Sequence, residues 1–391
     1  MKILFTTLRT TSHFLPLVPF LQACRRRGHE VAVAAPVDLA DKVAATGAAF
    51  FAFGHPGDAG LGPLWARIGS LPEEERVAVV IGELFAGACA GAALPGLLET
   101  VQRFQPSIIV RESQEYAAVI VGDKLRIPHV RVAITAASRD AELLSYAVPW
   151  IEKHREVFGA PPDPGGASIA NEPVLTLFPT AFGAPQFAHA EFLRFRAPRA
   201  AAPPLPDWWP GGAGDPFVYV TLGTVAGSMD AVRDMYRTVL AALAGLPLRV
   251  LFTVGAALPV ESLGDVPANV HVERFVPQDD VLPHARAVLC HGGSGTVLGA
   301  LAAGVPLVVV PMFADQPDNA ARVADAGAGI AVPQHGARPE DLRQALMRVL
   351  AEDSFRASAR TIASEMGALP PVDDAGLALE RLADRPSPAR A

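Results

Sequence analysis

Cysteine and long apolar runs are scarce in this chain of 391 residues. Its three cysteines, Cys24, Cys89 and Cys290, are too few and too widely spaced for a disulfide framework or a zinc site. They fit a reducing compartment, so we expect a cytoplasmic protein. The longest apolar run, residues 305–313, is far shorter than the roughly 20 residues of a membrane helix. Arg9 interrupts the apolar start, which is unlike a signal peptide, and we expect no stable membrane insertion.

Basic charge and the glycine motifs of common nucleotide enzymes are also missing. The formal net charge is −7, from 33 Lys and Arg against 40 Asp and Glu, and we therefore expect no nucleic-acid partner. The turn after the first predicted strand, TTLRTTSH, contains no glycine, which argues against a nicotinamide-dependent dehydrogenase. No GxxxxGK[ST] sequence is present, which argues against a P-loop nucleoside triphosphatase.

What is present is a strand–helix alternation that occurs twice. Apolar segments predict strands in each half of the chain, and amphipathic segments between them predict helices. The expected fold class is therefore α/β, with two Rossmann-like, doubly wound parallel-sheet domains. The expected strands cover residues 2–6, 31–36, 107–110 and 129–134, then 216–222, 248–255, 270–275, 287–290, 306–312 and 327–333, and expected helices include 16–27 and 230–243.

A segment rich in proline and glycine divides the two halves. We expect an N-terminal domain over residues 1–200, a linker over 201–215, a C-terminal domain over 216–383 and a loose tail over 384–391. The last helix could pack back on the N-terminal domain. Ligands of such sheets bind outside the carboxyl ends of the strands, so a cleft between the domains is the expected site.

The strongest motif is CHGGSGT at residues 290–296, between an apolar strand and a predicted helix. Its glycines allow close backbone approach, and the free N–H groups of a helix start favour a bound anion. Ser294, Thr296 and His291 add possible donors. The alternative is a plain glycine-rich turn in which Ser294 or Thr296 caps the helix.

Residues 274–296 and 304–320 together resemble the nucleotide-sugar signature of GT-B glycosyltransferases that act on small molecules. The likeness is greatest to bacterial enzymes that glycosylate polyketide and other natural-product aglycones. The resemblance implies a nucleotide diphospho-sugar donor in the C-terminal domain and an acceptor in the N-terminal domain. It also implies inversion at the anomeric carbon with neither a metal nor another cofactor.

The resemblance assigns donor contacts to residues that match the signature. Many relatives that use UDP-sugars carry Glu where this chain has Gly299, and that Glu holds the ribose hydroxyls. A dTDP-sugar is therefore favoured over a UDP-sugar. The implied contacts are Phe275 and Val276 for the base; Thr224, His291, Gly292, Gly293, Ser294, Gly295 and Thr296 for the diphosphate; and Asp315 and Gln316 for the sugar. Phe275 could instead be core, and Asp315 could merely cap the next turn.

His13 stands at the position of the family's general base, and a neutral imidazole suits that task. Glu112 occupies the position of its Asp partner, although Glu115 could substitute, His13 could act alone, or Glu112 could pair with a neighbouring arginine. Aromatic and imidazole rings of the N-terminal half could line an acceptor pocket or belong to the core. These candidates are His55, Trp65, Phe85, Tyr146 and Trp150.

The sequence thus predicts an inverting, metal-independent glycosyltransferase of secondary metabolism. It would move a sugar, expected to be a deoxysugar, onto a hydroxyl of a hydrophobic aglycone. A nucleotide-sugar epimerase of the same fold and a catalytically silent helper that binds nucleotide-sugars are the alternatives. The chain could also form a homodimer.

Overall fold

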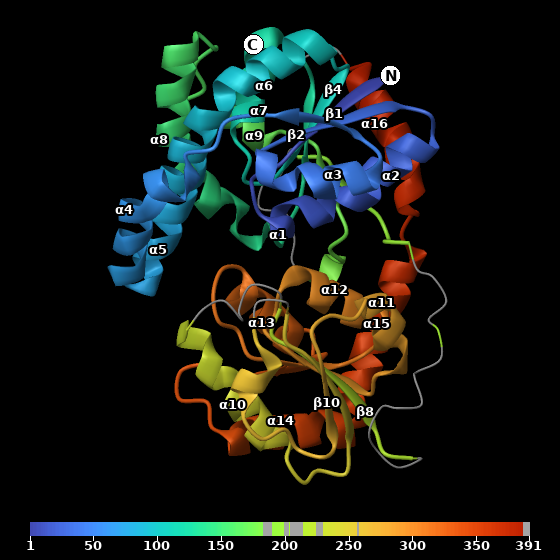
Figure 1. Cartoon of the computed structure of the whole chain (residues 1–391). Helices are drawn as coiled ribbons and strands as arrows, with labels where there is room; N and C mark the ends of the chain where they lie inside the picture. Colours follow the sequence, from blue (N-terminus) through green and yellow to red (C-terminus); the bar gives the residue numbers. More distant parts are fainter. Residues whose placement is uncertain (183–189, 199–202, 204–213, 224–229, 256–257, 386–391) are drawn as a thin grey trace. The chain divides into compact units, whose positions relative to one another are not determined.

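The computed structural model describes residues 1–182, 190–198, 203, 214–223, 230–255 and 258–385. The chain forms two compact units (Figure 1). The first comprises Met1–Phe178, Gly183–Pro198 and the chain from Pro370 onward, and the second comprises Pro179–Phe182 and Arg199–Leu369. Most of the expected linker 201–215 lies outside the described residues.

The first unit is built on a seven-stranded sheet in which every pairing is parallel. Its order is β3-β2-β1-β4-β5-β6-β7, so the winding direction reverses between β1 and β4. Buried parallel strands are continuously apolar, as the sequence of β1 shows. The strands are β1 Lys2–Thr6, β2 Glu30–Ala35, β3 Ala49–Ala52, β4 Ile108–Glu112, β5 His129–Val132, β6 Val174–Thr176 and β7 Phe192–Arg194.

Helices cover both faces of this sheet. On one face, α16, which comes from the end of the chain, packs against α2 (Figure 1). Phe20 and Cys24 of α2 share a buried apolar cluster with Leu379 and Leu382 of α16. The helices are α1 Thr11–Phe14, α2 Val18–Arg26, α3 Ala40–Thr46, α4 Gly57–Ser70, α5 Glu73–Ala78, α6 Ala90–Phe104, α7 Ala117–Leu125, α8 Asp140–Phe158, α9 Ala167–Ala170 and α16 Ala375–Ala383.

A π-helical segment, η3 Val79–Cys89, joins α5 to α6 in one continuous helical stretch. Residues Glu75–Phe104 are long and apolar enough to span a membrane by length and composition, and half of the most apolar window is buried inside the unit. A search for unbroken apolar runs overlooks this stretch because Glu83 interrupts it. Core helices pass the same test, and η3 packs against α8, where Trp150 contacts the helix at Gly82 and Gly87.

The second unit has a six-stranded parallel sheet in the order β10-β9-β8-β11-β12-β13. Here the winding reverses between β8 and β11. Its strands are β8 Phe217–Thr221, β9 Arg249–Thr253, β10 Val270–Glu273, β11 Ala287–Cys290, β12 Leu307–Val309 and β13 Gly329–Ala331. Its helices are α10 Asp230–Leu243, α11 Gln278–Val281, α12 Ser294–Ala302, α13 Gln316–Asp325, α14 Pro339–Ala351 and α15 Asp353–Ala368.

These two sheets confirm the predicted α/β class with two doubly wound parallel domains. The expected strands are present, most of them shorter than the apolar segment that predicted them. The strands β3, β6 and β7 were not among those predicted from the sequence. The final helix α16 belongs to the first unit, although the chain reaches it only after passing through the second.

Candidate active site

In each unit the central candidate residues, which are His13 with Glu112 in the first and the glycine turn after β11 in the second, lie at the carboxyl edge of the sheet where the strand order reverses. His13 follows β1 and Glu112 ends β4, and these two strands are paired in register. His291 follows β11, which pairs with β8. Ligands of open α/β sheets bind at such switch points, because loops diverge there and leave room.

His13 and Glu112 form a hydrogen-bonded pair. The Nδ1 atom of His13 lies 2.9 Å from Oε1 of Glu112. The Glu112 side chain is completely buried, whereas 14% of the His13 side chain is exposed. The backbone N–H of Gln114 donates to the other carboxylate oxygen at 2.7 Å. A carboxylate that accepts the Nδ1 proton leaves Nε2 as the proton acceptor of the ring.

Glu115 lies elsewhere and has a different role. Its carboxylate accepts the hydroxyl of Thr6 at 2.6 Å and the N–H groups of Ala117 and Ala118 at the start of α7. Burial raises the pKa of Glu115 to about 7, against the opposing effects of Thr6 and Arg111. Of the two acidic residues considered from the sequence, the structure places Glu112 against His13.

Phe85 is the acceptor candidate that the structure brings to the base. Its ring contacts the His13 ring edge to face, with centroids 5.5 Å apart. Trp150 packs on η3, and the hydroxyl of Tyr146 donates to Glu142. The two remaining candidates are His55, which accepts the N–H of Gly57, and Trp65, which is 49% exposed on α4.

Two glycines between β11 and α12, Gly292 and Gly293, leave no room for a side chain. Gly292 has a φ of 91°, and a Cβ there would lie 2.8 Å from Val309. A Cβ on Gly293 would lie 2.5 Å from Nε2 of His291. Gly293 is the N-cap of α12, with no side-chain cap, so neither Ser294 nor Thr296 caps the helix. The N–H groups of the first turn of α12 and the helix dipole favour an anion at this point.

The ring of His291 fits against two glycines. A Cβ on Gly223, after β8, would lie 2.7 Å from His291 Nε2, much as at Gly293. Burial lowers the pKa of His291 to about 4, so the ring is neutral near pH 7. Its Nδ1 atom is buried without a hydrogen-bond partner among the described residues. Thr224, expected to face the phosphates, lies outside the described residues.

Asp315 is held by two donors. Ser294 Oγ donates to Asp315 Oδ2 at 2.5 Å, and Asn319 Nδ2 donates to the same oxygen at 2.8 Å. Asn319 also donates to the carbonyl of Gly292, and so links α13 to the glycine turn. Burial raises the pKa of Asp315, partly offset by these hydrogen bonds. Asp315 stands at the N-cap position of α13 but makes no side-chain capping bond there.

Asn319 was not among the residues predicted from the sequence. Asp315 and Asn319 are four residues apart at the start of α13 and therefore share one face of that helix. Gln316 is 4% exposed, and its Oε1 accepts the N–H groups of Met312 and Phe313. That side chain holds the loop before α13 as well as being a candidate sugar contact.

The candidate base contacts precede α11. Phe275 is 69% exposed, which offers a free ring face and excludes the core interpretation, and Val276 follows it. Gln278 donates to the hydroxyl of Thr296 at 3.0 Å and so ties this loop to the glycine turn. In the described part of the chain, no group of three His, Cys, Asp or Glu side chains is arranged to hold a metal ion.

Comparisons with known proteins identify relatives of this chain. Residues 237–381 match the family described as "Erythromycin biosynthesis protein CIII-like, C-terminal domain". The chain is 31% identical to 4'-demethylrebeccamycin synthase of Lentzea aerocolonigenes, over 96% of this chain and 97% of that protein. It is 29% identical to tylactone mycaminosyltransferase of Streptomyces fradiae, over 98% and 92%.

Among solved structures, the glycosyltransferase VinC in complex with dTDP superposes with a TM-score of 0.79. The two chains are 26% identical, and the match covers 98% of this chain and all of that one (100%). Both units therefore have counterparts in a single known architecture.

Proposed function

The chain belongs to the GT-B glycosyltransferases of natural-product biosynthesis, and we propose that it transfers a deoxysugar from a dTDP-sugar to a hydroxyl of a hydrophobic aglycone. The reaction would proceed with inversion and without a metal. The observation that carries this proposal is the 2.9 Å pair of His13 and Glu112 at the switch point of the first sheet.

In the proposed reaction, Nε2 of His13 takes the proton of the acceptor hydroxyl. The acceptor oxygen forms its bond to the anomeric carbon while the bond from that carbon to the diphosphate oxygen breaks. Attack from the face opposite the leaving group inverts the configuration. Glu112 stabilises the imidazolium that forms, and solvent later removes the proton.

The leaving nucleoside diphosphate gains negative charge as the bond breaks. Stabilisation of this charge at the glycine turn is supported by the first N–H groups of α12, around Gly293 to Thr296, and by the dipole of that helix. His291 contributes a neutral ring nitrogen beside the same turn. Ser294 and Asn319 fix one carboxylate oxygen of Asp315, Oδ2, and this fixed orientation supports a contact with a sugar hydroxyl.

Gly299 supports dTDP as the nucleotide. It lies on α12 at the position where, according to the resemblance, many relatives that use UDP-sugars carry a glutamate that holds the ribose hydroxyls, and glycine offers no such contact. A deoxyribose loses least from this absence. The dTDP bound to the similar VinC points to the same nucleotide class. Phe85, beside His13, supports an apolar acceptor.

Calorimetry and a transfer assay test the proposal. We expect dTDP to bind more tightly than UDP, and a dTDP-deoxysugar with a panel of apolar aglycones to give an inverted glycoside that EDTA does not suppress. Gly299→Glu should improve UDP affinity by about 10-fold, as one charge-assisted hydrogen bond would. UDP preference in the natural chain would refute the donor assignment. Conversion of the donor without acceptor would favour an epimerase, and nucleotide binding without turnover would favour a silent helper.

A further inference from the structure

Arg111 is a completely buried charged residue directly before Glu112 on β4. Consecutive side chains of a strand point to opposite faces of the sheet, so Arg111 lies on the face away from the His13 contact. A buried guanidinium is expensive to desolvate and must be fully paired. Its partners therefore indicate what it does.

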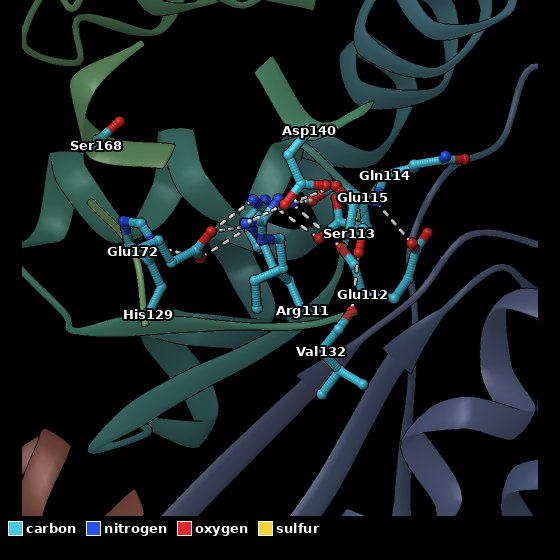
Figure 2. Close-up of polar contacts among 12 residues, drawn as sticks. Arg111, Glu112, Ser113, Gln114, Glu115, His129, Val132, Asp140, Ser168 and Glu172 are labelled. Carbon is cyan, nitrogen blue, oxygen red and sulfur yellow. Dashed lines mark hydrogen bonds and ion pairs between the residues drawn. The ribbon is translucent and has the colours of Figure 1, made fainter. Parts of the chain in front are cut away.

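The guanidinium of Arg111 bonds to a carboxylate on one side and to the backbone on the other (Figure 2). Its Nε and Nη2 donate to Glu172 at 3.0 and 2.6 Å. Its Nη1 donates to the carbonyl oxygens of Glu112, Ser113 and Glu115 at 3.2, 2.9 and 3.3 Å. The Arg111 side chain therefore holds the turn that follows β4 in place.

That turn positions the carboxylate of Glu112, which pairs with His13. The N–H of Gln114, inside the turn, donates to Oε2 of Glu112 at 2.7 Å, which directs Oε1 toward His13. The N–H of Glu115 donates back to the carbonyl of Glu112 at 3.2 Å. Displacement of the turn would therefore move the glutamate that orients the base.

Glu172 is itself fixed by a second buried residue. Nδ1 of His129, on β5, lies 2.7 Å from Glu172 Oε1, and Nε2 of His129 lies 3.5 Å from Asp123. Burial alone would raise the pKa of Glu172, but Arg111 and His129 lower it to about 2. The carboxylate therefore stays charged at every pH at which the enzyme would work.

We propose that Arg111 and Glu172 are positioning residues for the His13–Glu112 dyad, acting through the turn of residues 113–115. The pair determines where the side chain of Glu112, which is longer than the aspartate at this position in the family, meets the imidazole of His13. This inference rests on the proposed function for its kinetic consequence, but its geometric consequence is independent of turnover. Other ionisable groups that interact with Arg111 include Glu115, Tyr116 and Asp140.

The test uses Glu172→Gln and the double variant Arg111→Met/Glu172→Met in the full chain. Loss of one partner of a buried pair can prevent folding, whereas apolar replacement of both is often tolerated. We expect kcat/KM for transfer to fall about 10- to 100-fold, as for other residues that orient a reacting side chain.

A spectroscopic measurement does not require activity. The proton between His13 and Glu112 should give a downfield resonance in the proton NMR spectrum, assigned by its loss in His13→Ala. We expect Glu172→Gln and Arg111→Met/Glu172→Met to lose this resonance. The matched control is Arg131→Met/Asp140→Leu, which removes another buried Arg–carboxylate pair, 3.1 Å long, between β5 and the start of α8, and leaves the hydrogen bonds of Arg111 in place. The control should keep the resonance.

A folded Glu172→Gln or Arg111→Met/Glu172→Met variant, with unchanged dTDP affinity, that keeps both the resonance and the kcat/KM of the natural chain would overturn the inference. If the natural chain transfers no sugar but the resonance is lost in the Arg111 and Glu172 variants and kept in the control, the positioning role stands and the proposed function fails.

Discussion

Nδ1 of His13 lies 2.9 Å from Oε1 of Glu112, although 99 positions separate the two residues in sequence. The parallel pairing of β1 with β4 produces this contact, because both strands end at the same edge of the sheet. One residue follows the end of β1 and the other is the last residue of β4. An acid–base pair therefore arises from sheet topology and not from a local motif.

Removal of the imidazole tests the base assignment. We expect His13→Ala to lower kcat by about 100- to 10,000-fold, the usual contribution of a general base. The affinity for dTDP should be unchanged, because the glycine turn belongs to the second unit. His29→Gln is the matched control, since it disrupts another His–Glu pair, 3.1 Å long, before β2 at the opposite edge of the same sheet. Transfer within a few-fold of normal in His13→Ala would contradict the assignment.

Two alanine substitutions in one turn separate packing from ligand binding. In Gly293→Ala the new Cβ would lie 2.5 Å from His291 Nε2, so we expect the ring to move and dTDP affinity to fall at least about 10-fold. In Gly295→Ala nothing lies within 4 Å of the new Cβ, and the unfolding temperature should stay the same or rise. Equal loss of stability in both variants would show that His291 does not fix the Gly293 position.

The buried ring of His291 predicts proton uptake on nucleotide binding. Burial holds its pKa at about 4 in the free protein, and a bound diphosphate should raise that pKa by favouring the charged ring. Affinity for dTDP should therefore increase as pH falls from about 6.5 toward 4. Calorimetry in buffers of different ionisation enthalpy measures the uptake, and His291→Asn corrects for the protons of the nucleotide itself. Identical uptake in both proteins would place the diphosphate away from this ring.

His129 predicts a loss of stability in alkali. Burial opposes its charge, but Glu172 and Asp123 raise its pKa to about 9 from an ordinary 6.5. A raised pKa in the folded state gives stability that is complete below pH 6.5 and is lost as the pH rises to about 9. Chemical denaturation from pH 6 to 10 should show this decline in the natural chain and a flatter profile in His129→Gln. Parallel profiles would mean that the ring is uncharged.

The second unit was the more predictable half. Its strands are short apolar runs, and the glycines of residues 292–295 mark where β11 ends and α12 begins. Both signals are local, so they can be recognised along the chain. The strands β3 and β7 were missed because they are the two edge strands of their sheet and none of their residues is fully buried, which weakens the apolar pattern. The strand β6 was also missed, and its three residues lie in a short run between Pro173 and Pro179.

The site was predictable only where a residue type matched a known position. His13 and Glu112 followed from the resemblance, whereas the pairing of Arg111 with Glu172 spans 61 positions and leaves no local pattern. An arginine next to the candidate glutamate, Glu112, suggested a salt bridge that would compete with His13. The structure shows no competition, because alternation along β4 points the two side chains to opposite faces and Arg111 donates to the backbone carbonyl of Glu112.

The return of the chain end to the first unit limits how such enzymes can be recombined. The backbone of Arg196 bonds to Pro370 and Val372, and Arg27 of α2 pairs with Glu380 of α16. A chimera that fuses residues 1–198 to the second half of a relative would bring in a foreign last helix against Phe20 and Cys24. Exchange of the second unit therefore calls for two junctions, one on each side of residues 199–369, so that each first unit keeps its own C-terminal helix.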